Sequence, residues 1–303
     1  MPSEKSIASI TSATARIIRP LSTSWKGSLQ FKIGFTMLIV LIGLAIIEAP
    51  LNNYRLHGED PMTPGRYEAF LPPSLEHPLG TDIFGRDLLA LFLLGYKYSL
   101  IIGLMAGLCS EVFVIVISAI AGYKGGIWDY ILNSMTNAML LIPSYVILLL
   151  LIAHMRTSSL EILSLCIAIF SWPYPTRIMR AQIKSLREME FVNLAKVSGL
   201  NDFEIMFKEI IPNILPYIFI TTIYGIIGAM MTETGLRFLG IGPGNIPSIG
   251  LFLYWVMRWS LLANYGMVIF PIVLLVSTFI SLTLISAGLE EIFNPRLKRI
   301  TGL

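Results

Sequence analysis

Six long runs of apolar residues recur along the chain, and they constrain its fold more than any other feature of the sequence. A bilayer core about 30 Å thick needs about 20 helical residues to cross it. The 303 residues are 55% hydrophobic and only 14% charged, whereas a soluble domain carries about a quarter charged residues. We therefore predict an all-α, polytopic membrane protein with six transmembrane helices, at 31–49, 98–121, 130–153, 160–179, 214–235 and 264–289.

Proline and glycine qualify two of these assignments. The fourth span contains SWPYP, whose Pro173 and Pro175 predict either a simple kink or a pivot at this point. The uncharged stretch 238–257 holds so many glycines and prolines that no continuous helix survives. We expect an external loop there with a short interfacial helix around Leu251–Trp255. A seventh span is the alternative, and it would place the two ends of the chain on opposite sides of the membrane.

The distribution of basic residues predicts the orientation. Cytoplasmic loops of membrane proteins carry an excess of lysine and arginine. With the N-terminus inside, 15 of the 22 lysine and arginine residues fall on the cytoplasmic side. We therefore expect N-in, C-in topology. The expected segments are a cytoplasmic N-terminal arm at 1–30 without a signal peptide, an external loop at 50–97, and a core at 98–303 with a cytoplasmic loop at 185–212.

The external loop contains an amphipathic segment, Gly80–Asp87. Thr81 and Asp82 are suitable N-cap residues. We expect a short capped helix that rests on the external membrane face. A gate over an aqueous pathway is the alternative.

The loop at 185–212 has the pattern of two short helices. One face of the first helix carries Phe191, Leu194, Ala195 and Ser198. Gly199 follows, where a left-handed helix end is expected, and Asn201 with Asp202 suits the start of the second helix. Two interpretations stay open from physical chemistry alone: an amphipathic hairpin on the lipid surface, or an element that presents a helix to a soluble partner.

Two of the acidic residues within the predicted spans, Glu111 and Glu233, are candidates for a functional role. A charge at the bilayer centre costs about 2.5 kcal/mol or more. Glu111 must therefore be neutral, paired or in contact with water. It is either a hydrogen-bonded carboxyl between helices or a residue that lines an aqueous pathway. Glu233 lies near the outer end of the fifth span, and we expect a hydrogen-bonded carboxylate that serves packing or a gate.

The sequence lacks motifs for catalysis, metal binding or nucleotide binding. None of the three histidines lies in an H-E-x-x-H helix, and no Gly-Lys dipeptide is present to form a phosphate-binding loop. The two cysteines, Cys109 and Cys166, fall in apolar runs and are expected to be buried. We therefore expect no catalytic, cofactor or metal site and no enzymatic activity. The net charge of +3 gives no indication of nucleic acid binding.

Three segments resemble a known family of membrane proteins. HPLGTDIFGRDLLALFLLGYKYSLIIGL, at 77–104, closely resembles the segment before the second span in C-type subunits of dipeptide and oligopeptide permeases, which are ABC importers. Ala121–Ser144 is similar to the next segment of that family, and Glu233–Gly242 to a further signature, with Arg237 departing. The resemblance extends over residues 30–297.

The loop at 185–212 is similar to the EAA loop of these permeases. Asn193, Leu194 and Ala195 stand at the Glu-Ala-Ala positions, and Gly199 at the glycine. Asn193 replaces the acid, Leu194 replaces an alanine and Glu209 stands where histidine is usual. The resemblance implies coupling helices that contact ATPase subunits through Phe191, Asn193, Leu194, Ala195, Ser198, Gly199, Leu200 and Asp202.

The family implies a permease subunit of the dipeptide, oligopeptide and nickel transporters in the plasma or inner membrane. Its implied partners are a homologous B-type permease, two ATP-binding subunits, an extracellular substrate-binding protein and the lipid bilayer. Peptides are the expected substrate, with oligosaccharides or nickel as alternatives. A secondary transporter or channel is the alternative of another class, and Glu111 and Glu233 are the candidates for the pathway.

Overall fold

A computed structural model describes residues 27–155, 159–258 and 265–293. Most of the N-terminal arm expected at 1–30 and the first residue of the span expected at 264–289 lie outside the described residues. The described part is helical and contains no strand beyond an isolated bridge between Thr81 and Asp87. The expectation of an all-α chain is confirmed for these residues.

Four helices are long and apolar enough to cross a membrane. They are α2 (Leu29–Arg55), α3 (Leu88–Ala119) with its π-helical extension η1 (Ile120–Lys124), α10 (Ile211–Phe238) with the short elements before it, and α12 (Tyr265–Phe293). Two further pairs qualify only together, and each is bent: α4 (Gly126–Leu141) with α5 (Ser144–Met155) by 77°, and α6 (Leu160–Ser171) with α7 (Pro173–Arg187) by 51°. The described residues thus hold four to six candidate spans.

Proline accounts for both bends. The break before Pro173 confirms the kink expected in SWPYP. The break at Pro143 was not expected, because the span at 130–153 was predicted as one helix. Ile142 is extended, with φ −76° and ψ 131°, as a residue before proline prefers. The missing N–H of Pro143 then prevents α4 from continuing.

The connection between α2 and α3 differs from the expectation. It covers residues 56–87, because α2 extends to Arg55 and α3 begins at Leu88. The helix expected at Gly80–Asp87 was wrong: the segment forms turns, with Gly80 and Gly85 at φ +78° and +68°. The N-cap residue is instead Asp87, at the start of α3. Its carboxylate accepts a hydrogen bond from Ala90 N–H at 2.9 Å.

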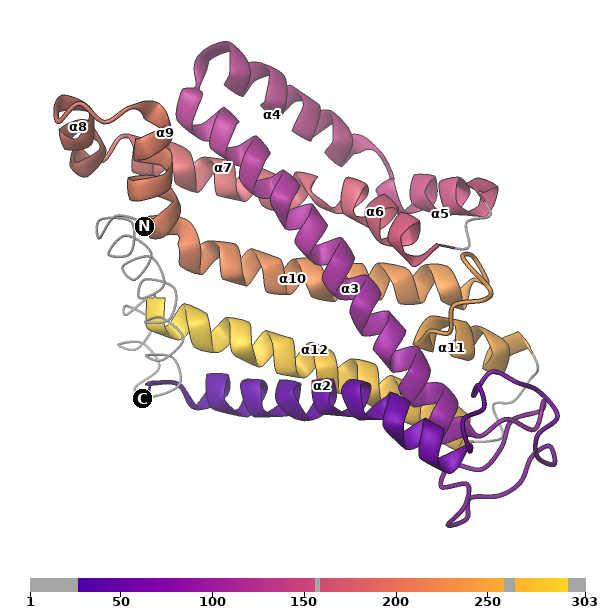
Figure 1. The fold of residues 1–303 in the computed structure, drawn as a ribbon. Coiled ribbons are helices and arrows are strands. Elements are labelled where there is room, and N and C mark those ends of the chain that lie inside the picture. The colour runs from indigo at the N-terminus through magenta and orange to yellow at the C-terminus, as the bar shows by residue number, and fades with distance from the viewer. Residues whose placement is uncertain (1–26, 156–158, 259–264, 294–303) are drawn as a thin grey trace, which may run out of the picture.

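The long helices pack in two pairs. α3 packs obliquely across α10, and α12 lies along α2 (Figure 1). Gly34 brings α2 against α12 closely enough for the Ser281 hydroxyl to donate to Gly34 O at 2.8 Å. Small residues permit this approach between spans. Cys166 is buried as expected, whereas Cys109 is exposed on α3, because it faces away from the other helices.

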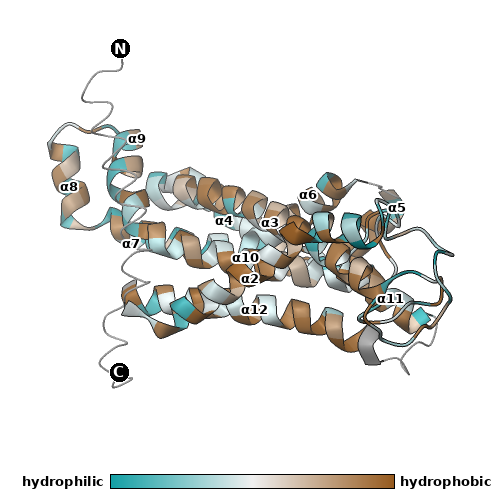
Figure 2. Ribbon diagram, turned by 60° about the horizontal axis from the view of Figure 1, so that its bottom comes forward, coloured by the Kyte–Doolittle hydropathy of each residue, from teal (hydrophilic) through white to brown (hydrophobic). Residues whose placement is uncertain are grey.

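The two ends of the bundle carry different short elements. One end, the α8 end, bears α8 (Glu190–Val197), α9 (Asp202–Ile205) and the π-helix η2 (Met206–Ile210). The opposite end, the α11 end, bears residues 56–87 and α11 (Ile249–Arg258). The short helix expected around Leu251–Trp255 is thus present, as α11. Figure 2 shows hydrophobic residues along the long helices and hydrophilic residues in the loops beside α11.

Candidate functional site

The turn after α8 has the geometry predicted from Gly199. Its φ is +85°, a left-handed conformation that suits glycine. Gly199 N–H donates to Lys196 O at 3.0 Å, and Leu200 N–H donates to Ala195 O at 3.2 Å. These two bonds form a Schellman motif, which satisfies the last carbonyl groups of the helix. The chain therefore reverses sharply at Gly199.

The second helix starts as predicted at Asn201. The Asn201 side chain accepts from Glu204 N–H at 2.9 Å, and Asn201 N–H donates to the Glu204 carboxylate at 3.2 Å. This reciprocal pair is a capping box. Lys208 also donates to Glu204, and these bonds lower the pKa of the Glu204 carboxyl on the exposed loop. The start of α9 is thereby fixed directly after the Gly199 turn.

The two faces of α8 differ in exposure. Val192 and Ala195 are buried against the protein. Leu194 and Val197 project from the opposite face, with 67% and 88% of their surface exposed. Two large aliphatic side chains in solvent at the tip of a short helix are a feature of a surface that another protein covers. The α8 helix therefore has one face packed on its own subunit and one face that no described residue of the chain covers.

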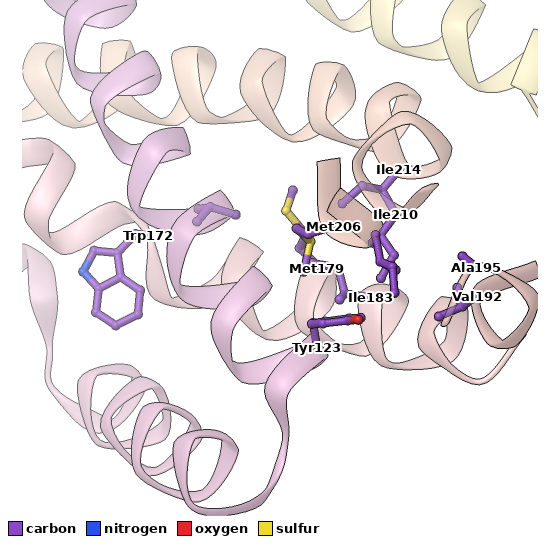
Figure 3. Packing of buried hydrophobic residues seen from close by; sticks show 11 residues of the cluster. Tyr123, Trp172, Met179, Ile183, Val192, Ala195, Met206, Ile210 and Ile214 are labelled. Carbon is purple, nitrogen blue, oxygen red and sulfur yellow. The ribbon is translucent and has the colours of Figure 1, made fainter. Parts of the chain in front are cut away.

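An apolar cluster attaches this segment to the long helices. Figure 3 shows side chains from α8, η2 and the start of α10 meeting those of η1 and α7. Its buried members are Val114, Tyr123, Trp172, Met179, Ile183, Val192, Ala195, Ile205, Met206, Ile210 and Ile214. Four elements of the bundle thus share one close-packed core with the α8 segment.

Polar contacts reinforce the same junction. The Tyr123 hydroxyl on η1 donates to the Asp202 carboxylate at 2.9 Å. Arg187 at the end of α7 donates to Tyr123 O at 3.0 Å. Arg180 forms a two-bond ion pair with Asp129 at the start of α4, one of its contacts measuring 2.7 Å. The ends of α3, α4 and α7 are therefore held to one another beside α8.

The structure separates the predicted coupling residues into two groups. Ala195 is buried, and Phe191 and Leu200 pack against the apolar cluster. The exposed members are Asn193, Leu194, Ser198, Gly199 and Asp202. Sequence reasoning missed Val197, the most exposed large hydrophobic residue of α8. Its position three residues after Leu194 was the available signal, since residues at this spacing share a helix face.

Glu111 lies buried between α3 and α10. Its carboxylate accepts a hydrogen bond from the Thr221 hydroxyl at 2.9 Å. This placement fits the interpretation of a hydrogen-bonded carboxyl between helices. A role in lining a pathway stays a prediction.

Glu233 lies in a buried polar network near the α11 end. It accepts from the Ser99 hydroxyl at 3.1 Å, and its other oxygen lies 3.9 Å from Arg237 Nε. Arg237, whose surface is 1% exposed, also donates to Ser248 Oγ and to the carbonyl groups of Pro243 and Ile246. The guanidinium thus fixes the loop between α10 and α11, which sequence reasoning did not foresee.

Comparison with known proteins identifies the family. Residues 114–299 match the family model described as "Binding-protein-dependent transport system inner membrane component". The chain belongs to this family. The matched range includes α8, the Gly199 turn, Glu233 and Arg237. The chain is therefore a permease component of a cell-membrane transport system, in which ATP hydrolysis lies on separate subunits.

Individual relatives cover most of the chain. The oligopeptide transport system permease protein OppC of Mycobacterium tuberculosis is 31% identical over 227 residues, which are 74% of this chain and 77% of the relative. A putative peptide transport system permease protein of Brucella suis is 32% identical over 273 residues, 89% and 88% of the two chains. The dipeptide transport system permease protein DppC of Haemophilus influenzae is 30% identical over 268 residues, 86% and 89%.

Proposed function

We propose that this permease is the C-type subunit of an ATP-driven peptide importer, forms half of its translocation pore, and receives the motion of the ATPase subunits through α8. The names of the three relatives support peptides as the substrate class. The exposure of Leu194 and Val197 carries the docking assignment, because the other face of the same helix is buried. A groove on an ATPase subunit that takes an amphipathic helix would cover both side chains.

The proposal includes six spans with both ends of the chain in the cytoplasm. Each bent pair, α4 with α5 and α6 with α7, counts as one span. The excess of basic residues supports a cytoplasmic arm at 1–30 and a cytoplasmic α8 end. Residues 56–87 and α11 then lie outside, where a substrate-binding protein delivers its ligand. The further partners are a homologous B-type permease and two ATP-binding subunits.

The apolar cluster supplies the mechanical step. ATP binding closes the ATPase dimer, which moves α8 because the helix is held in its groove. The cluster transmits this motion to α3, α7 and α10, and the bend at Pro173 separates α7 from the outer part of its span. The permease pair then changes between inward-open and outward-open states, and ATP biases the equilibrium by binding one state more tightly.

A charge placed on the exposed face of α8 tests the docking assignment. Leu194→Asp and Val197→Asp put an unpaired carboxylate into the proposed groove, which is costly. We expect loss of co-purification with the ATPase subunits and loss of ATP-driven peptide uptake in proteoliposomes. Leu75→Asp is the matched control, because Leu75 is fully exposed at the α11 end. Normal assembly of both α8 variants would refute this docking surface.

The alternatives make different predictions in the same assay. The assembly with ATPase subunits could take up oligosaccharides or nickel in place of peptides. The coupling mechanism would then stand, and only the proposed substrate class would be wrong. Transport by the purified chain alone, without ATP, would indicate a secondary transporter or channel and would overturn the proposal.

A further inference from the structure

Helix α4 carries a polar stripe on the side that faces away from its own subunit. The stripe consists of Tyr130, Asn133, Ser134 and Asn137. Their spacing of three, four and seven residues places them on one face of the helix. Tyr130 is 72% exposed, Ser134 and Asn137 are exposed, and Asn133 is half-buried. The polar stripe therefore has no covering element in the described part of the subunit.

The polar groups of the stripe are unsatisfied within the described residues. No hydrogen bond joins Asn133, Ser134 or Asn137 to another described residue. Thr136, by contrast, is buried and donates to Leu132 O at 2.8 Å, one turn back on its own helix. The side chains of the stripe thus remain available to an external hydrogen-bonding partner.

The position of Asn137 within the proposed span argues against lipid as that partner. Asn137 follows Gly126, the first residue of α4, by eleven positions, which corresponds to about 17 Å along a helix. The hydrocarbon core is about 30 Å thick, and in the proposed six-span topology, with α4 entering the membrane at its first residue, Asn137 lies inside this core. An amide that faces hydrocarbon without a hydrogen bond costs several kcal/mol. Water, a polar solute or another protein must therefore contact this face.

Helix α3 provides the contrast. Its outward side chains Leu104, Leu108, Val112 and Val116 are 42% to 60% exposed and wholly apolar. Lipid chains can cover such an apolar face without leaving a polar group unpaired. The outward surface of α3 is thus apolar at these positions, whereas that of α4 carries the polar stripe beside exposed apolar residues such as Ile127, Ile131 and Met135. The stripe is the part of the two helices that lipid does not satisfy.

We propose that the polar stripe of α4 lines the translocation passage and contacts the main chain of the passing peptide. This inference rests on the proposed function. A side-chain amide offers both donors and an acceptor, as a peptide group does. The charged residue nearest the stripe, Asp129, is engaged by Arg180 on α7. An uncharged lining of this kind binds the main-chain groups that all peptides share and leaves their side chains unselected.

Thiol labelling tests whether the stripe faces water. In a complex with Cys109→Ser and Cys166→Ala, single cysteines are introduced as Ser134→Cys and Asn137→Cys. The matched controls are Leu108→Cys and Val112→Cys on the lipid-facing side of α3. A charged, membrane-impermeant methanethiosulfonate reagent is applied without nucleotide and in the vanadate-trapped state. We expect labelling at the two stripe positions more than about tenfold faster than at the controls in at least one state, since the thiolate forms in water.

Each outcome decides the inference. The inference would be overturned if Asn137→Cys is labelled as slowly as the controls in both states. The complex must assemble, and its cysteine must be labelled fully after denaturation. Such a result would indicate that the stripe packs against the second permease. Uptake of tri-alanine supplies an independent arm: Asn137→Leu is expected to lower it about fivefold, as for one lost hydrogen bond, while Asn137→Gln largely retains it. Equal uptake by Asn137→Leu and Asn137→Gln would show that the Asn137 amide does not contact the peptide. A wild-type complex that takes up no peptide would refute the proposed function, whereas the labelling pattern reports the passage whatever the substrate.

Discussion

The two ends of the helical bundle are held together by different chemistry. At the α8 end, a cluster of aliphatic, aromatic and sulfur-containing side chains joins the short helices to the long ones, and the polar contacts beside it, such as Arg180 with Asp129, are only partly buried. At the α11 end, an apolar cluster of α3 and α11 is accompanied by polar and charged contacts that are largely buried. Asp87 binds Arg55 and His77 at 2.9 and 2.8 Å, Asp82 binds Arg86 at 2.6 Å, and Arg237 holds the loop before α11.

This difference shows which end can be displaced. Apolar contacts are non-directional, so a cluster of them can shift as its neighbours move. Buried ion pairs and charge-assisted hydrogen bonds require fixed geometry and lose much when one partner is misplaced. We infer that the α8 end is suited to move with an attached partner, while the α11 end provides the fixed frame.

Removal of Arg237 should have the largest effect. Arg237→Met removes the cation beside the buried Glu233 carboxylate and leaves two carbonyl groups without their donor, a change that costs about 3–5 kcal/mol. Thermal unfolding of the complex in detergent measures the loss. The control is Arg258→Met, since Arg258 is exposed on α11. Equal stability of the two variants would show that the α11 end is not held by charge.

Truncation within the apolar cluster should come next. Ile205 is fully buried in α9, and Ile205→Ala is expected to destabilise the α8 segment by about 2–4 kcal/mol. Hydrogen exchange across α8 and α9 reports this local loss. Phe203→Ala on the same helix is the control, because Phe203 is 72% exposed. Faster exchange in the Phe203 variant than in the Ile205 variant would contradict the packing described here.

Substitutions at Gly199 should have a graded, purely conformational effect. A Cβ at Gly199 would meet no atom within 4 Å, but φ is +85°. We expect Asn to be tolerated, Ala to cost about 1 kcal/mol, and Val to cost more and to uncouple ATP hydrolysis from uptake. The ratio of ATPase activity to transport measures the coupling. Gly228→Ala, at an open helical position in α10, is the control. Normal coupling in the Val variant would refute the role of the turn.

Loss of an exposed ion pair should have the smallest effect. Lys208 and Glu204 form an i,i+4 pair at 2.7 Å with side chains 59% and 36% exposed. Solvent screens such a pair, so Lys208→Ala should not change the midpoint of thermal unfolding measurably. A decrease as large as that of Arg237→Met would remove the distinction between the two ends.

The sequence was sufficient wherever local chemistry decides the structure. Gly199 and Asn201 sit in a Schellman motif and a capping box, whose signals lie within a few residues of one another. The kink at Pro173 follows from the proline itself. The family assignment came from contiguous motifs, and the family match agrees with it.

Features that depend on distant residues were not predictable. Gly80 and Gly85 turn against the carbonyl groups of Leu71 and Tyr67, so the segment at 80–87 follows a neighbouring loop in place of its own helical pattern. Arg237 finds its partners in a loop that sequence reasoning could not position. Val197 was missed because its exposure depends on how α8 lies on the bundle.

The exposure of Leu194 and Val197 also bears on the assembly of the transporter. In the proposed complex the ATPase subunit covers both side chains, whereas a newly made permease without its partner exposes them to the cytosol. Exposed aliphatic side chains of this kind promote aggregation. The exposed face of α8 would then also make a permease subunit without its ATPase prone to aggregation. The supply of ATPase subunits would therefore limit how much assembled permease accumulates.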